Sequence, residues 1–345
     1  MLDLFKERLE LIEKEISAAL PLQLSPAWLE ATAGEALPHL SLSQLEEVTR
    51  PAVSLLGRGG KRWRPLLMLL SAELCGSGER ALHLTPLAEI PHDGSLIVDD
   101  IEDGSMTRRG APAIHLQFGL DLAINAANLM YFQPTALLAR SPLSENEKGT
   151  VLRFFLEDMR RLHLGQGLDI LWHRDHRIAP SLQEYLQMCR LKTGSLARTA
   201  ARIGALAGGG DEGTASRLGN IAQDFGAAFQ IRDDVKNLTS GVPGKDRGED
   251  IVEGKKSLPV ILYMEAQPEG RRVFASLFRS LAEGSKPAAE GIEEAVALLE
   301  ASGCLAEADR MGAEILRGAS GRLEELFPPC EPLRLIQELM RGLLT

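Results

Sequence analysis

Helical periodicity is the feature of this sequence that most restricts its fold. Through most of the 345 residues, apolar side chains recur at every third or fourth position. Aromatic residues make up only 5%, and the residue types that favour strands are thinly scattered. Breaks at Gly, Pro and Ser predict roughly a dozen helices and an all-α fold. The expected helices include residues 1–20, 41–56, 65–74, 86–103, 121–138, 148–171, 181–209, 213–238 and 258–266.

The charge balance excludes some classes of function. A net charge of −10 makes the chain a poor candidate for coating nucleic acid, and an anionic ligand would need local basic clusters or metal ions. The longest apolar runs, such as 65–70, are far shorter than the ~20 residues that cross a bilayer. The first residues do not resemble a secretory signal, and the four cysteines form no CxxC pair. We therefore expect a cytoplasmic protein with reduced thiols and no membrane span.

An acidic cluster ends one of the predicted helices. Asp99 and Asp103 lie one helical turn apart, with Asp100 beside them. Carboxylates crowded in this way repel one another unless a cation intervenes, and their hard oxygen atoms suit Mg²⁺ shared with a phosphate-bearing ligand. The alternative is an acidic helix end in contact with solvent. The motif alone does not decide between the two.

A second Asp-Asp pair follows 134 positions later, at Asp233 and Asp234 (233 − 99 = 134). Asn237 takes the place of the third acid, and its amide can still offer a ligand oxygen. The adjacent Arg108 and Arg109 lie in a glycine-flanked loop, which suits bidentate contact with phosphate. Each feature alone could be an ordinary charged surface. Together they indicate a site for a metal and a phosphate-bearing ligand.

The pieces of this predicted site are spread widely along the chain. GGKRWRP at 59–65, KTG at 192–194 and the lysines of the Gly-rich loop at 239–257 add further cations. A domain boundary between them would divide the site. We therefore expect a single domain, residues 1–345.

These motifs resemble those of the trans-isoprenyl diphosphate (polyprenyl) synthase family. They are GGKRWRP at 59–65, HDGSLIVDDIEDGSMTRRGAP at 92–112, GQGLDI at 165–170, KTG at 192–194, FQIRDD at 229–234 and GKDRGEDIVEGKKSLP at 244–259. DDIED and DDVKNL look most like the geranylgeranyl diphosphate synthase branch. The resemblance implies one large helical barrel of the isoprenoid synthase type, a homodimer, and condensation of isopentenyl diphosphate with an allylic diphosphate.

The resemblance also implies roles for individual residues. Two Mg²⁺ ions would be held by Asp99, Asp100 and Asp103, and a third by Asp233. The allylic diphosphate would contact Arg108, Lys192, Thr193, Gln230, Lys245 and Lys255. Isopentenyl diphosphate would contact Gly60, Lys61, Arg64, His92 and Arg109. The expected catalytic residues are Asp99, Asp100, Asp103, Arg108, Lys192, Asp233 and Asp234.

The implied chemistry agrees with these residue types. Cleavage of an allylic carbon–oxygen bond requires stabilisation of the diphosphate leaving group, which cations provide. The carbocation must be kept from water, and the released diphosphate can accept the final proton. Gly94 and Ser95, one turn before the first acid, cannot block a growing chain. We therefore expect a product of twenty carbons, with a longer product as the second expectation. The residues that end chain elongation should lie deeper in the fold.

Two alternatives remain open at the level of sequence. A class I terpene cyclase also uses Asp-rich motifs and Mg²⁺, but it would not need the GGKRWRP segment or Arg109 for a second diphosphate. A catalytically silent regulatory subunit of a prenyl synthase would be expected to lose metal ligands, and both Asp pairs are intact here.

Overall fold

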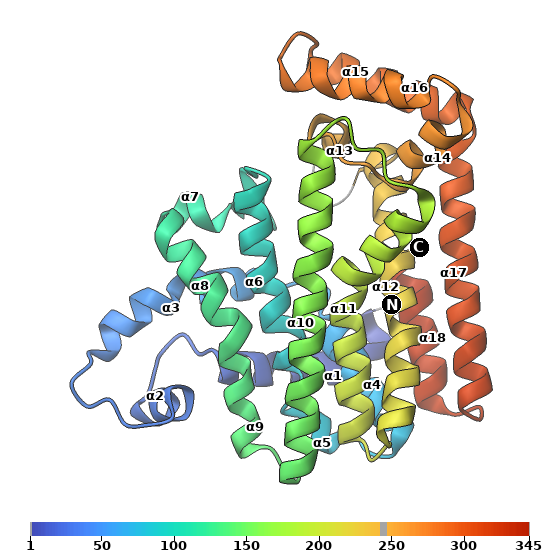
Figure 1. Ribbon diagram of the computed structural model, residues 1–345. Coiled ribbons are helices and arrows are strands. Elements are labelled where there is room, and N and C mark those ends of the chain that lie inside the picture. Colours follow the sequence, from blue (N-terminus) through green and yellow to red (C-terminus); the bar gives the residue numbers. More distant parts are fainter. Residues whose placement is uncertain (1, 242–246, 345) are drawn as a thin grey trace. The chain divides into compact units, whose positions relative to one another are not determined.

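The computed structural model describes residues 2–241 and 247–344, and these are helical almost throughout (Figure 1). The first half contains α1 (Leu2–Ala19), α2 (Pro26–Ala33), α3 (Leu42–Gly57), α4 (Trp63–Cys75), α5 (Glu79–Leu82), α6 (Pro86–Glu102), β1 (Thr107–Arg108), β2 (Ala111–Pro112), α7 (Ile114–Phe118), α8 (Leu120–Phe132), the 3-10 helix η1 (Gln133–Ala136) and α9 (Leu137–Arg140). The second half contains α10 (Glu145–Arg174), α11 (Leu182–Ala207), α12 (Glu212–Leu238), α13 (Glu249–Val252), α14 (Leu258–Ala266), α15 (Gly270–Ala282), α16 (Ala288–Ala301), α17 (Cys304–Leu326) and α18 (Glu331–Leu344). The predicted all-α fold is confirmed.

Three segments differ from the sequence-based expectation, one of them being α13 (Glu249–Val252), which lies within the loop expected at 239–257. The loop expected at 104–112 contains a small antiparallel hairpin, in which Thr107 pairs with Pro112 and Arg108 with Ala111. The helix expected at 121–138 is divided into α8, η1 and α9, because Pro134 lacks the N–H that a continuous helix needs. In contrast, α6 continues through Pro91.

The chain forms two compact units. The first comprises Met1–Leu156, Thr199–Gly219 and Pro329–Leu339, and the second comprises Glu157–Arg198, Asn220–Pro328 and Met340–Thr345. The expectation of a single domain over residues 1–345 stays a prediction.

Glycines in the first unit allow close contacts between helices. A Cβ atom on Gly204 of α11 would lie 2.1 Å from the carbonyl oxygen of Met68 on α4, so only glycine fits there. Residues Trp63–Ala72 of α4 are buried on all sides, and each large apolar side chain among them contributes about 1.5–3 kcal/mol of burial. Helix α4 is therefore the centre of this unit.

In the second unit, glycines also allow close contacts between helices, here between α10, α11 and α12. A Cβ on Gly165 would lie 2.3 Å from the backbone nitrogen of Lys192, and one on Gly226 would lie 2.7 Å from the Cα of Gly194. The apolar core of this unit extends to α14, α15 and α16, with Phe274 and Phe278 fully buried. The glycines of GQGLDI and KTG thus set the spacing of the helices that carry Asp169 and Lys192.

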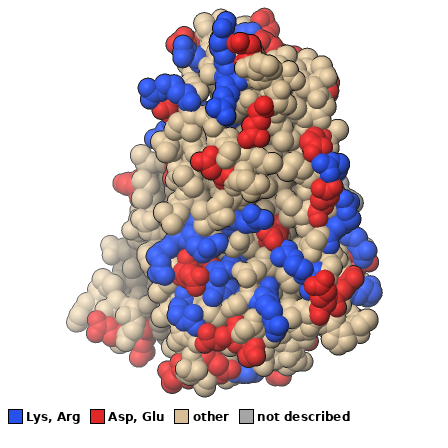
Figure 2. Space-filling view, turned by 45° about the vertical axis from the view of Figure 1, so that its right-hand side comes forward, with Lys and Arg blue, Asp and Glu red and all other residues tan. Residues whose placement is uncertain are grey.

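Charged side chains of both signs are interspersed on the face shown in Figure 2. Among the residues described, no helix is long and apolar enough to cross a membrane. All four cysteines are free.

Candidate active site

The first acidic motif lies at the carboxyl end of α6, in the first unit. Asp99 and Asp100 belong to the last turn, and Asp103 caps the helix. Asp100 is fully buried (0% exposed), which raises its pKa, and the nearby Arg108 opposes that rise. Its Oδ1 accepts a hydrogen bond from Nε of Arg108 at 2.8 Å, while its Oδ2 has no hydrogen-bond partner among the described residues. The motif is a compact cluster of carboxylates next to a guanidinium.

The hairpin after α6 presents the two adjacent arginines. Arg109 and Gly110 form its two-residue turn with φ values of 52° and 74°, as a primed hairpin turn requires. A positive φ is unfavourable for arginine, so other contacts must hold this turn. Arg58 does part of this, because its Nη1 donates to the carbonyl oxygens of Arg108 at 3.0 Å and Pro112 at 2.9 Å. No role for Arg58 was expected from the sequence.

The glycine turn between α3 and α4 meets this hairpin. A Cβ on Gly60 would lie 3.1 Å from Nη2 of Arg109 and 3.4 Å from Nη1 of Arg62. The absence of a side chain at Gly60 therefore lets two guanidinium groups approach its backbone. The structure brings Gly60 and Arg109 together, and their role in binding isopentenyl diphosphate stays a prediction.

Other residues predicted for isopentenyl diphosphate lie in the same unit. Lys61 is exposed, and Arg64 is buried with its guanidinium 4.3 Å from the ring centre of Trp63. Shielding from water, together with Arg64 and Arg109, holds the pKa of His92 well below its usual value. His92 is therefore neutral at physiological pH, and can accept or donate a hydrogen bond without adding charge.

Two buried carboxylates of α6 support the arginines, and sequence analysis did not identify them. Glu89 and Asp93 lie at the core of the first unit, where burial raises the pKa of each and the arginines oppose the rise. Arg62 donates to Glu89 at 2.8 Å, and Arg109 donates to Asp93 at 2.6 Å. The positions follow helical spacing of i and i+4, but a sequence does not reveal what faces a buried acid.

The second unit holds the lysines predicted to bind the allylic diphosphate. Nζ of Lys192 donates to Asp169 at 2.6 Å. Burial would raise the pKa of Asp169, but Lys192 and Lys255 hold it below its usual value. Asp169, within GQGLDI, thus lies near both lysines and was given no role from the sequence. Lys245 lies outside the described residues.

A hydrogen-bonded chain connects three motifs of the second unit. Thr193 donates to Oε1 of Gln230 at 2.7 Å, and Gln230 donates to Oδ1 of Asp234 at 2.9 Å. Oδ2 of Asp234 accepts from the Tyr185 hydroxyl at 2.6 Å and from the backbone N–H of Leu258 at 3.1 Å. Burial, with a smaller effect of Asp250, raises the pKa of Asp234 to about 7. Asp234 organises KTG and the second acidic motif around Gln230.

The donor groups of both motifs suit a hard divalent cation. Asp99, Asp100 and Asp103 supply carboxylate oxygens, one of which, Oδ2 of Asp100, is buried with no hydrogen-bond partner in the described chain. In the second unit, Asp233 is half-buried, and both polar side-chain atoms of the buried Asn237 lack hydrogen-bond partners there. Within residues 2–241 and 247–344, no three acidic, His or Cys side chains already surround one point. The residue types fit Mg²⁺, and the role of each stays a prediction.

The predicted chain-length positions differ in their surroundings. A Cβ on Gly94 would lie 2.9 Å from Cβ of Met130 and 3.1 Å from the carbonyl oxygen of Ala127, both on α8. Gly94 thus permits close contact between α6 and α8. Ser95 is half-buried, and its hydroxyl donates to the carbonyl oxygen of His92 at 2.7 Å. A larger side chain at Gly94 would disturb helix packing, so Ser95 is the better position at which to test chain length.

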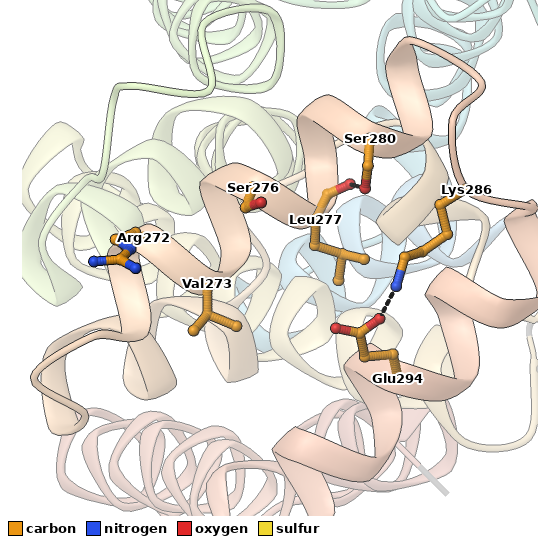
Figure 3. A pocket seen from close by; sticks show the side chains of 7 residues that line it. All are labelled: Arg272, Val273, Ser276, Leu277, Ser280, Lys286 and Glu294. Atoms are coloured by element: carbon orange, nitrogen blue, oxygen red, sulfur yellow. Dashed lines mark hydrogen bonds and ion pairs between the residues drawn. The ribbon is translucent and has the colours of Figure 1, made fainter.

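One hollow in the second unit is remote in sequence from all of these residues. It lies between α15 and α16 with a volume of about 310 Å³, and no predicted site residue lines it (Figure 3). Lys286 and Glu294 point toward each other across it and form an ion pair, and Arg272, which also lines it, pairs with Glu269 outside it. It offers no chemistry for the predicted reaction.

Comparison with known proteins gives a consistent result. The family model for polyprenyl synthetase matches residues 45–297. A geranylgeranyl pyrophosphate synthase of Rhodocybe pseudopiperita is 35% identical over 276 residues, covering 77% of this chain and 75% of that protein. A geranylfarnesyl diphosphate synthase of Aeropyrum pernix is 33% identical over 268 residues, covering 75% and 81%. The crystal structure of a geranylgeranyl pyrophosphate synthetase from Pyrococcus horikoshii matches 99% of this chain and 97% of that one, with a TM-score of 0.85 and 27% identity.

Proposed function

The chain belongs to the polyprenyl synthetase family, and from this we propose how its residues perform that family's reaction. The protein is a prenyltransferase that condenses isopentenyl diphosphate with an allylic diphosphate to give geranylgeranyl diphosphate or a longer product. The observation that supports the residue roles best is the cluster at α6. There the acidic motif, the RRG hairpin and the glycine turn are gathered within one unit.

We assign the allylic diphosphate to the two acidic motifs and the cations of the second unit. Two unit charges of like sign repel by about 4 kcal/mol at about 4 Å and an effective dielectric of about 20, so carboxylates alone would reject this anion. Mg²⁺ held by Asp99, Asp100, Asp103 and Asp233, with three ions as the expected number, would neutralise the leaving group as its charge develops. Arg108, Lys192, Thr193, Gln230, Lys245 and Lys255 would bind its oxygen atoms.

We assign isopentenyl diphosphate to a pocket in the first unit that needs no metal. Arg109 and Arg64 supply guanidinium donors, Lys61 supplies a mobile positive charge, and Gly60 leaves space for close approach. The neutral His92 can orient the ligand through a hydrogen bond. The double bond then attacks the allylic cation, and the released diphosphate accepts the proton, so no separate protein base is required.

We propose a twenty-carbon product and a homodimer. Gly94 and Ser95 present no bulky side chain on α6, so neither enforces an early stop. Apolar side chains exposed on α8, among them Leu120 and Phe132 at 53% and 64%, offer a surface that a second copy could cover. A cytoplasmic location stays a prediction from the cysteine pattern of the sequence.

Product analysis tests this function. The purified protein is incubated with Mg²⁺, isopentenyl diphosphate and allylic diphosphates of five, ten or fifteen carbons, and the products are separated by chromatography. We expect a prenyl diphosphate of twenty carbons. A cyclic hydrocarbon formed from the allylic substrate alone would indicate a terpene cyclase, and binding without release of diphosphate would indicate a silent subunit.

A further inference from the structure

Asp93 is a buried carboxylate that joins two arginines of the first unit. It is fully buried (0% exposed) on α6. Its Oδ1 accepts from Nη2 of Arg109 at 2.6 Å, and its Oδ2 accepts from Nη1 of Arg109 at 3.2 Å and from Nη1 of Arg62 at 3.3 Å. Asp93 therefore holds the outer fork of Arg109 by a bidentate pair.

The contacts of Arg109 leave one edge of its guanidinium available. Of its five N–H groups, both on Nη1 are used, since Nη1 also donates to the carbonyl oxygen of Leu55 at 3.3 Å. One N–H of Nη2 is used by Asp93. The N–H of Nε and the second N–H of Nη2 have no acceptor among the described residues, and they lie side by side. This pair has the geometry that binds two phosphate oxygens at once.

The two arginines depend on Asp93 to different degrees. Arg62 also donates to Glu89 at 2.8 Å, to Glu13 at 2.7 Å and to the carbonyl oxygen of Leu56 at 2.7 Å. Arg109 has Asp93 as its one carboxylate partner in the described chain. Apart from Asp93, the one acceptor of the Arg109 side chain among the described residues is the carbonyl oxygen of Leu55, at 3.3 Å. Loss of Asp93 would release Arg109 and leave Arg62 in place.

We propose that Asp93 is a positioning residue, which fixes Arg109 so that its Nε edge faces the diphosphate of isopentenyl diphosphate. The inference rests on the proposed function and adds a residue to it. Asp93 does not touch the ligand, and it acts through the orientation of Arg109. Glu89 provides a matched control, because it is an equally buried acid on the same helix whose hydrogen bonds reach Arg62 and not Arg109.

The test compares steady-state kinetics of the wild type, Asp93→Asn and Glu89→Gln. Misplacing a ligand-binding group through its supporting partner typically costs about 10-fold or more, so we expect Asp93→Asn to raise KM for isopentenyl diphosphate by about 10-fold. KM for the allylic diphosphate should stay near the wild-type value. Both variants should lower the thermal unfolding temperature by similar amounts. Glu89→Gln should leave KM for isopentenyl diphosphate close to that of the wild type. A purely structural role would move both variants alike.

Two results would overturn the proposal: an unchanged KM in Asp93→Asn, or an equal rise in both variants. If Asp93→Asn does not fold, the same rise in KM is required of Asp93→Glu, which keeps the charge but displaces the carboxylate by one methylene. Failure of the proposed function is a separate outcome, because it would appear as absence of turnover in the wild-type protein.

Discussion

The contact between α10 and α11 gives a quantitative prediction for Gly165→Ala. An added Cβ would lie 2.3 Å from the backbone nitrogen of Lys192, whereas ordinary contact begins at 3.4 Å, so the helices must separate by about 1.1 Å (3.4 − 2.3). Overpacking of this kind costs about 1–3 kcal/mol, and Ala in place of helical Gly returns about 0.5–1 kcal/mol. The two ranges combine to a net loss of about 0–2.5 kcal/mol in the free energy of unfolding.

Gly167 supplies the matched control within the same motif. It is exposed on α10, and an added Cβ would meet no atom within 4 Å. Gly167→Ala should therefore gain about 0.5–1 kcal/mol from helix propensity alone. Urea denaturation followed by circular dichroism measures both variants.

Gly165→Ala should also affect catalysis, because the backbone that it displaces belongs to Lys192. We expect Gly165→Ala to raise KM for the allylic diphosphate, with Gly167→Ala near the wild type. Equal stability of the two variants would refute the close approach of α10 and α11 at this point. Lower stability with an unchanged KM would show that the position of Lys192 does not depend on this contact.

Three further predictions concern charge, metal ligation and product length. Lys256 is buried beneath Phe278 and donates to backbone carbonyls of Trp172 and Gly254; burial lowers its pKa from 10.5 to about 8. Between pH 8 and 10.5, Lys256 binds more protons in the unfolded chain than in the folded one. The free energy of unfolding of the wild type, relative to that of Lys256→Met, should therefore rise with pH across this window in denaturation experiments. A difference that does not change with pH would contradict the assignment. Asp99→Ala should abolish turnover and keep the helical circular dichroism spectrum; near-normal activity would remove Asp99 from the ligand set. Ser95→Phe should shorten the product seen by chromatography, and an unchanged product would show that the tail does not pass this turn of α6.

The helices and the identity of the motifs could be predicted from the sequence, because both depend on local spacing. The boundaries of α6, α12 and α14 match the expected ones within one residue or so, since Pro, Gly and charged segments end them. The hairpin at 107–112 was not expected, because two residue pairs are too short to produce a strand pattern. Its Arg-Gly turn is also a poor sequence signal, because the first position of such a turn favours Asn, Asp or Gly.

The supporting residues of the site could not be predicted in the same way. Asp93 lies six residues before the acidic cluster, and only tertiary contact shows that it pairs with Arg109. Nothing in the sequence distinguishes Arg58 from other arginines near glycines. Its role follows from its hydrogen bonds to the hairpin carbonyl oxygens, which depend on the tertiary structure. The shared role of Asp99 and Asp233 as metal ligands also stays a prediction, since they belong to different units.

The backbone of Arg62 and Arg109 has a consequence for how the first unit opens. Both residues adopt left-handed conformations, with φ of 48° and 52°, in turns that are far apart in sequence. Asp93 accepts hydrogen bonds from both side chains, but Arg62 also donates to Glu89 and Glu13, so relaxation of the hairpin should leave the glycine turn in place. The hairpin turn should therefore open more readily than the glycine turn, and amide exchange should rise first in the hairpin.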